Sequence, residues 1–166
     1  GEFEYLFLEY FDQMEAWADA AVKSLKASGY KQLYQQSIDA GYMVHGEYNY
    51  HNILFDATSE KDNYGHRKLN VYTVNFDHFK KNVQVEDLYY FLRKAMEKQG
   101  FKEWISDGIL NAYSAIIPLG KNELEYLKNR LMYPEKFFKV ANSYYHSNKA
   151  WISIKNVEKM QMAVRQ

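Results

Sequence analysis

Polar side chains with the chemistry of a phosphoryl-transfer site occur at two points of the sequence. In VHGEYNYHNILFD, Glu47 supplies a carboxylate, and Asn52, five residues later, supplies a carbonyl oxygen that can bind a hard cation. In VNFD, Asn75 and Asp77 offer further oxygen ligands. Phosphoryl transfer uses an acid to orient the attacking hydroxyl, together with an asparagine and a second acid that hold magnesium. The candidate catalytic residue is therefore Glu47, and the candidate metal ligands are Asn52, Asn75 and Asp77.

A short β-hairpin is expected to bring these two points together. The apolar run 53–55 predicts a strand over residues 53–56 after the first point, and residues 71–76 combine β-branched and aromatic residues in alternation at the second. Residues 56–69 are polar and contain one glycine, which predicts a connection between the two strands.

The rest of the chain has helical periodicity, with apolar residues recurring at steps of three and four. The predicted helices cover residues 3–28, 31–40, 85–99, 102–117, 121–132, 134–146 and 155–165. No internal repeat, low-complexity tract or linker divides the chain. We therefore predict a mainly α protein (α+β) with one short hairpin, folded as a single domain over residues 1–166 around one core.

Composition restricts the class of partner. The 21 basic and 21 acidic side chains cancel, which argues against nucleic acid and anionic membranes as partners. The sequence contains no cysteine, which excludes disulfides and thiolate zinc sites. No apolar run approaches the roughly 20 residues of a membrane span. These features predict a soluble, intracellular protein.

The order and spacing of these motifs resemble a known family. HGE with its asparagine, the hairpin, NFD and the following EDLYYFLRK are similar to the aminoglycoside-phosphotransferase branch of the protein-kinase-like fold. Within that branch they most resemble the CotS-type spore-coat kinase-like proteins. The later segments YPEKFFKVANSYYHSNKAW and NVEKMQ are similar to the same family, so the resemblance covers nearly the whole chain.

The resemblance implies the helical C-terminal lobe of a kinase-like protein. The N-terminal nucleotide-binding lobe, with its phosphate-covering loop and lysine, is absent from this chain, which we expect to be a separate lobe or a proteolytic fragment. The intact parent would use ATP and Mg²⁺ if active, and neither is expected to bind to this lobe alone. The expected partners are its own N-terminal lobe and spore-coat proteins, and the expected location is the cytoplasm or the spore coat. His45 would pack under the catalytic loop, and Asp87 would support the backbone amides of that loop.

Two departures from the family pattern predict impaired activity. Glu47 stands where the family has a catalytic aspartate, which moves the carboxylate outward by one methylene. Asn75 stands where the family has a metal-binding aspartate, and the lost charge weakens cation binding. Asp77 would supply the missing negative charge only if the strand shifted in register. A pseudokinase that acts as a coat scaffold or interaction domain is therefore the alternative function, and an unrelated helical interaction domain is a third.

Plainer interpretations remain open for several of these residues. Asn52 and Asn75 could cap turns, and Asp87 could be a first-turn acid that favours the helix dipole. A zinc site formed by His45, Glu47 and His51 is disfavoured because the spacing is not HExxH and a fourth ligand is not evident.

Two surface features are also expected. The surface around Tyr48, Tyr50 and Phe76 would be uncovered without the other lobe and would favour self-association. A second group of residues is predicted to be a solvated basic face rather than a phosphate site: Lys80, Lys81, Arg93 and Lys94. Packing of helices 3–28 and 85–99 on opposite sides of the hairpin would argue against the third alternative, an unrelated helical interaction domain.

Overall fold

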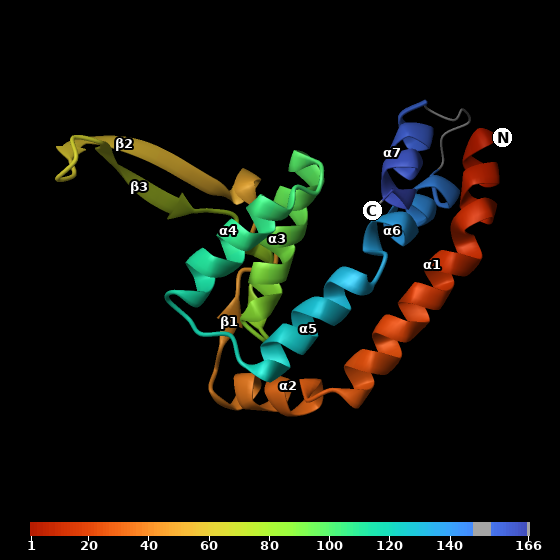
Figure 1. Cartoon of the computed structure of the whole chain (residues 1–166), viewed down its shortest axis with the longest axis horizontal. Helices are drawn as coiled ribbons and strands as arrows, with labels where there is room; N and C mark the ends of the chain where they lie inside the picture. The colour runs from red at the N-terminus through yellow and green to blue at the C-terminus, as the bar shows by residue number, and fades with distance from the viewer. Residues whose placement is uncertain (148–153, 166) are drawn as a thin grey trace.

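The computed structural model describes residues 1–147 and 154–165 and is mainly helical. Its described α-helices are α1 (Glu2–Ala27), α2 (Tyr30–Asp39), α3 (Val85–Gln99), α4 (Glu103–Ser114), α5 (Lys121–Met132), α6 (Glu135–Tyr145) and α7 (Ile154–Val164). The remaining elements are two small antiparallel sheets and two 3-10 turns, η1 (Tyr50–Asn52) and η2 (Phe76–His78). Figure 1 shows their arrangement. The mainly helical class predicted from periodicity is confirmed.

The helix boundaries follow local sequence signals. The predicted helices 85–99 and 121–132 match α3 and α5, and the other helix ends differ from the predicted positions by at most three residues. Helix α3 ends where Gly100 adopts a left-handed conformation with φ of 69°, which glycine enters without a steric penalty.

The hairpin is longer than predicted. Strand β2 (Ile53–Lys61) pairs with β3 (Arg67–Thr73), with Ile53 opposite Thr73. The prediction of a hairpin at this place is confirmed, but residues 56–69 are mostly strand rather than connection, and the second strand ends before residue 76. A tight turn explains the difference, because Asp62 Oδ1 accepts hydrogen bonds from the amides of Tyr64 and His66. Backbone pairing therefore extends through polar residues whose side chains are mostly exposed.

The second sheet was not predicted. Strand β1 (Met43–Val44) pairs with β4 (Lys80–Lys81), which places Val44 opposite Lys80. Each strand has two residues, which is too short for a periodicity signal. This pairing holds together the two segments that flank the hairpin.

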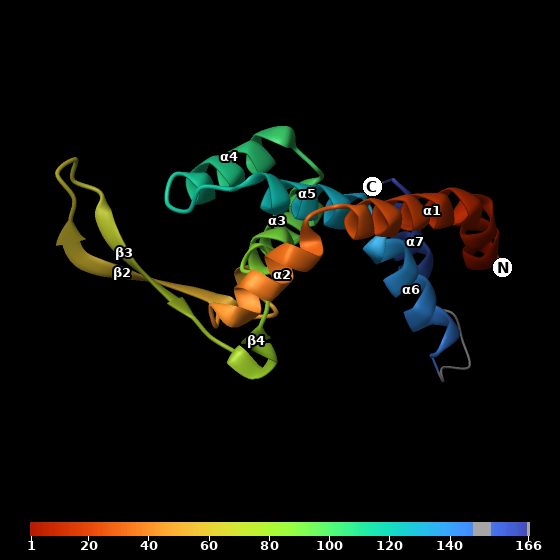
Figure 2. The ribbon, with the colours of Figure 1, turned by 90° about the horizontal axis from the view of Figure 1, so that it is seen from below.

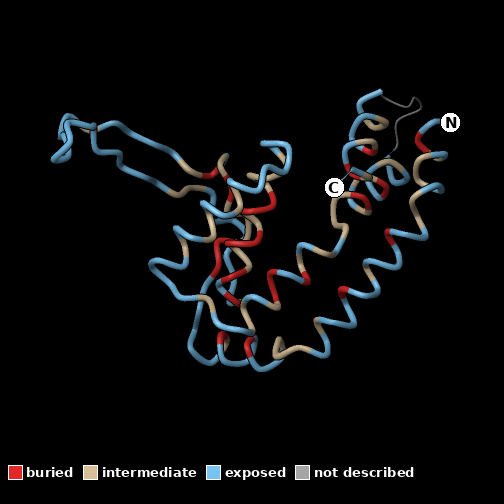
Figure 3. The backbone as a smooth tube through the Cα atoms, viewed as in Figure 1, coloured by how far each residue is buried: buried red, intermediate tan, exposed pale blue. Residues whose placement is uncertain are grey.

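The buried hydrophobic residues form two clusters instead of the single core that chain length predicts. The first lies among α2, α3 and α5, and the second lies among α1, α6 and α7. Figure 3 shows buried segments in both regions. Helix α1 has 26 residues and is therefore about 39 Å long, which lets it serve both clusters. Its Leu25 packs against the first cluster, while Phe3 and Met14 belong to the second.

The β2–β3 hairpin projects away from the helices in both ribbon views (Figures 1 and 2). Helices α1 and α3 do not pack on opposite sides of the hairpin (Figures 1 and 2), so their packing does not argue against an unrelated helical interaction domain. Within the described residues, no helix combines the length and the apolar character that crossing a bilayer requires.

Candidate functional site

The candidate site is built around the loop between β1 and η1. Gly46 has φ of 88°, and a Cβ atom at this position would collide with the carbonyl oxygen of His78. Because only glycine tolerates both the conformation and the close approach, Gly46 fixes the path of the loop before Glu47. The β1–β4 pairing brings the His78 segment to this position.

Asp87, in the first turn of α3, holds the same loop. Its Oδ2 accepts a hydrogen bond from the amide of His45 at 2.6 Å, and its Oδ1 accepts one from the amide of Gly46 at 3.0 Å. Hydrogen bonds to an ionised acceptor are stronger than neutral ones. Asp87 therefore supports the loop directly, in addition to any effect on the helix dipole.

His45 connects the loop to the segment that follows β3. The residue is buried, with 6% of its surface exposed, and its Nε2 lies 2.8 Å from the carbonyl oxygen of Val74. Its Nδ1 accepts a hydrogen bond from the amide of Glu47 at 3.2 Å. These two partners assign the proton to Nε2, since a carbonyl only accepts and an amide only donates. The ring also packs beside Phe76, with 4.7 Å between centroids.

Three asparagine side chains form a network beneath Glu47. The carbonyl oxygen of Glu47 accepts from Asn52 Nδ2 at 2.9 Å and from Asn49 Nδ2 at 3.0 Å. Asn75 Nδ2 donates to Asn52 Oδ1 at 2.7 Å. Asn49 and Asn52 are buried, whereas Asn75 is exposed and adopts a left-handed conformation. The backbone carbonyl of Glu47 and the side chains of Asn52 and Asn75 therefore meet at one place, from both sides of the hairpin, whereas no hydrogen bond or ion pair among the described residues joins the Glu47 carboxylate to these asparagines.

Asp77 does not join this network. It lies exposed in η2, and no hydrogen bond or ion pair among the described residues connects its carboxylate to Glu47, Asn52 or Asn75.

The Glu47 carboxylate faces partly into solvent. Its side chain is 45% exposed, and its Oε1 lies 3.6 Å from His78 Nε2, an ion pair only when His78 is protonated. Burial, followed by the charge of Glu47, raises the pKa of Tyr90 on α3. Glu47 is thus held by its backbone while its carboxylate remains accessible to solvent.

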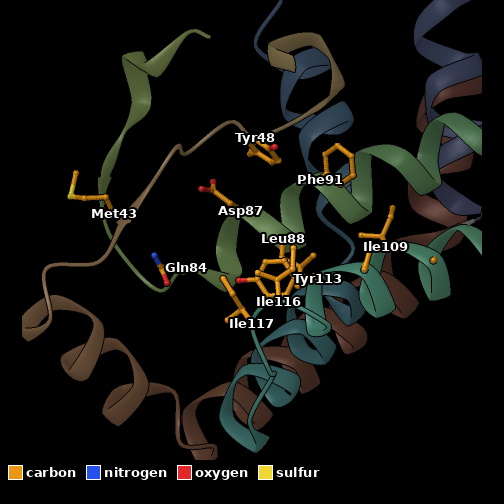
Figure 4. Close-up of a pocket in the computed structure, with 12 residues that line it drawn as sticks. Met43, Tyr48, Gln84, Asp87, Leu88, Phe91, Ile109, Tyr113, Ile116 and Ile117 are labelled. Atoms are coloured by element: carbon orange, nitrogen blue, oxygen red, sulfur yellow. The ribbon is translucent and has the colours of Figure 1, made fainter. Parts of the chain in front are cut away.

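A cavity of about 630 Å³ adjoins the supported loop. Figure 4 shows Asp87, Leu88 and Phe91 of α3 on one side and residues of α4 on another, with Tyr48 above them. This volume falls in the range of about 300–1,000 Å³ that is typical of small-molecule sites. The lining is mainly apolar, so the cavity suits a hydrophobic group rather than a phosphate.

The network is a weak site for a dication. One lone pair of Asn52 Oδ1 is already used by Asn75, and the Glu47 carboxylate makes no hydrogen bond or ion pair to these asparagines among the described residues. Magnesium sites in proteins rely on one or two carboxylates plus phosphate oxygens. Among residues 1–147 and 154–165, no group of three or more histidine, cysteine or acidic side chains is placed to hold a metal ion. His51, considered for zinc, packs instead against the ring of Tyr50.

The basic face predicted near this site is only partly solvated. Lys80 pairs with Glu86 at 3.1 Å, and Lys81 is exposed. Arg93, however, is buried and pairs with Glu97 at 2.8 Å, so its assignment to a solvated face is wrong. Amphipathic periodicity fails here because α3 packs on more than one side.

Two residues of the site were not identified from the sequence. Asn49 accepts from the amide of His51 through Oδ1 while donating to Glu47, an Asx turn that its position before a tight bend could have suggested. His78 contributes a carbonyl oxygen and an imidazole through the β1–β4 pairing, and no local pattern indicates that contact.

Comparisons of the chain with protein-family models, with curated proteins and with solved structures found no significant match.

Proposed function

We propose that this chain is the C-terminal lobe of a CotS-type, spore-coat-associated kinase-like protein, related to small-molecule phosphotransferases and impaired in catalysis. The observation that supports it is one hydrogen-bonded cluster that joins the backbone carbonyl of Glu47 to the side chains of Asn52 and Asn75, across up to 28 positions of the chain. Neither turn capping nor helix packing requires side chains from both sides of the hairpin to converge.

In this proposal the intact parent holds ATP and Mg²⁺ between this lobe and an N-terminal lobe. Glu47 orients the acceptor hydroxyl through its exposed carboxylate, and the oxygens of Asn52 and Asn75 face the cation. Asp87 and His45 do not react but hold the loop that carries Glu47. The isolated lobe does not phosphorylate a substrate, because the groups that cover the phosphates belong to the other lobe.

Asn75 is the position at which to test this function. Asn75→Asp adds a carboxylate beside Asn52 and Glu47, and aspartate tolerates the left-handed backbone found there. Thermal unfolding of the chain is measured with Mn²⁺ alone and with Mn²⁺ plus ATP. We expect a metal-dependent rise in Tm for Asn75→Asp that exceeds any rise in the wild-type chain, since a ligand that binds only the folded state stabilises it.

The matched control is Asn63→Asp, which makes the same charge change at an exposed position of the hairpin turn. A metal response no larger in Asn75→Asp than in Asn63→Asp would contradict a cation site at this cluster. Stabilisation of the wild-type chain by ATP without metal would favour a nucleotide-binding pseudokinase.

A second candidate is a pseudokinase that acts as a coat scaffold, and the exposed hairpin favours it. The strand register places Phe55 beside Val71 and Ala57 beside Leu69, so these residues share one face, while Leu54 and Tyr72 share the other. Phe55 is 66% exposed and Leu69 is 58% exposed. An apolar surface on a projecting hairpin is typical of a contact with another protein or lobe. The aromatic surface of Phe76, 52% exposed, lies at the base of this hairpin.

A further inference from the structure

A second cavity, away from the Glu47 cluster, is bounded by α3, α6 and α7 and has a volume of about 300 Å³. Helices α6 and α7 lie side by side in Figures 1 and 2. The charged residues that line the cavity are Arg93, Lys94, Glu97, Lys136, Lys139 and Lys159. Five cations therefore surround one carboxylate, although the whole chain is neutral.

The inner cation of this cavity lacks a partner for one of its donors. Arg93 is 8% exposed, donates from Nη1 to Glu97 at 2.8 Å and from Nη2 to Glu135 at 3.5 Å. Its Nε has no hydrogen-bond partner among the described residues. The Nε atom is enclosed, so an anion in the cavity would be attracted by the charge of this incompletely paired guanidinium rather than by a hydrogen bond to Nε.

Glu97 does not neutralise the cations that line the cavity with it, and Glu135, outside the lining, forms ion pairs with Arg93 and Arg130. Glu97 lies within 4.0 Å of Lys94 and 3.6 Å of Lys136, besides its contact with Arg93. Burial lowers the pKa of Lys94, and the charges of Arg93, Lys139 and Lys136 lower it further, against the opposing effect of Glu97. Lys139 and Lys159 add two exposed ammonium groups at the opening.

Neutral donors complete the lining. Ser143 of α6 and Asn156 of α7 supply a hydroxyl and an amide that can bond to oxygen atoms. Phosphate groups are recognised by this combination of guanidinium, ammonium and neutral donors. The volume lies at the small end of the range for ligand sites, which favours a compact anion.

We propose that this cavity binds a compact, phosphate-bearing polyanion between α3, α6 and α7. The site is separate from the Glu47 cluster and does not depend on the proposed kinase-like function. It gives the chain a second ligand, recognised by charge and by hydrogen bonds to phosphate oxygens.

The test uses tripolyphosphate as the probe, without metal and at fixed ionic strength, with affinity measured by isothermal titration calorimetry. The double variant Lys139→Gln/Lys159→Gln removes two exposed cations, so the fold should be retained, and the Tm without ligand checks this. We expect its affinity to fall on the order of tenfold, as the loss of two partly screened charge contacts implies. The control Lys31→Gln/Lys128→Gln makes the same charge change at exposed positions of α2 and α5 and should change affinity less than twofold.

An equal loss in both double variants would overturn the proposal, because it would show only an effect of net charge. Absence of tripolyphosphate binding to the wild-type chain would also overturn it. Asn75→Asp should leave this affinity unchanged, so failure here is distinguishable from failure of the proposed function.

A free compound and a lipid headgroup present the same phosphate chemistry. Co-sedimentation with vesicles of phosphatidylcholine containing phosphatidic acid separates the two sources. Vesicle binding that is lost in Lys139→Gln/Lys159→Gln identifies a headgroup, whereas tripolyphosphate binding without vesicle binding identifies a soluble ligand.

Discussion

Replacing Asp87 with asparagine tests whether this side chain holds the loop or only favours the dipole of α3. The carboxylate accepts two backbone hydrogen bonds, at 2.6 Å from the His45 amide and 3.0 Å from the Gly46 amide. Each hydrogen bond to a charged group contributes about 1.5–3 kcal/mol. Asparagine retains one acceptor oxygen and turns an NH₂ group toward the other amide, so one bond is lost and the other becomes neutral. We expect Asp87→Asn to lower the free energy of unfolding by about 2–4 kcal/mol.

The measurement is urea unfolding followed by circular dichroism, with the slope of the transition used to check that the unfolded state is unchanged. Glu103→Gln is the matched control, because Glu103 is an exposed acid in the first turn of α4 whose carboxylate makes no hydrogen bond or ion pair among the described residues. The dipole effect predicts a loss of about 0.3–1 kcal/mol for the control. Hydrogen exchange should also accelerate at the amides of His45 and Gly46 in Asp87→Asn alone. A loss no greater than that of Glu103→Gln, with unchanged exchange at these amides, would refute the direct support of the loop.

Three further outcomes are expected. Gly65→Ala should lower the free energy of unfolding by roughly 1–2 kcal/mol, because Gly65 has a positive φ. Gly46→Ala should lower it by at least twice as much, because a Cβ atom at position 46 also collides with the His78 carbonyl. Urea unfolding measures both losses, and equal losses would contradict the close approach. Burial alone would raise the pKa of Glu135, but hydrogen bonding to Tyr89 and the nearby cations outweigh burial and lower this pKa. The ionised Glu135 carboxylate therefore stabilises the fold above about pH 4.5, and this stabilisation is lost as the pH falls below that value. The wild-type chain should therefore lose more stability than Glu135→Gln on acidification, and parallel pH profiles would oppose this assignment. Sedimentation velocity should show concentration-dependent self-association that Val71→Lys weakens, whereas equal behaviour of both chains would exclude the hairpin face as the contact.

The local sequence was sufficient to predict the helices, because their backbone hydrogen bonds join residues only a few positions apart. The apolar spacing of α3 and α5 and the glycine after α3 predict both helices, because each depends on contacts within a few residues. The hairpin was predicted in place but not in length. Its outer pairs, such as Asp56 with Asn70, carry polar side chains, and their pairing depends on the turn at Asp62 rather than on burial.

The candidate site, too, was predicted from the sequence only in part. The residue types of Glu47, Asn52 and Asn75 suggested oxygen-based chemistry, but not that Asn75 would donate to Asn52 and use one of its lone pairs. The contribution of His78 depends on a sheet of two-residue strands, for which the chain carries no periodic pattern.

The sequence by itself determined the helical class, most helix boundaries and the two points that carry the polar groups, since all of these depend on periodicity, glycine conformation and residue chemistry. Only the tertiary structure decided that the core divides into two clusters along α1, that Arg93 is buried beside a group of lysines, and that the amides on both sides of the hairpin contact each other. These features join residues far apart in the chain. They are stabilised by burial and by hydrogen bonds between residues distant in the sequence, and no local sequence pattern predicts such contacts.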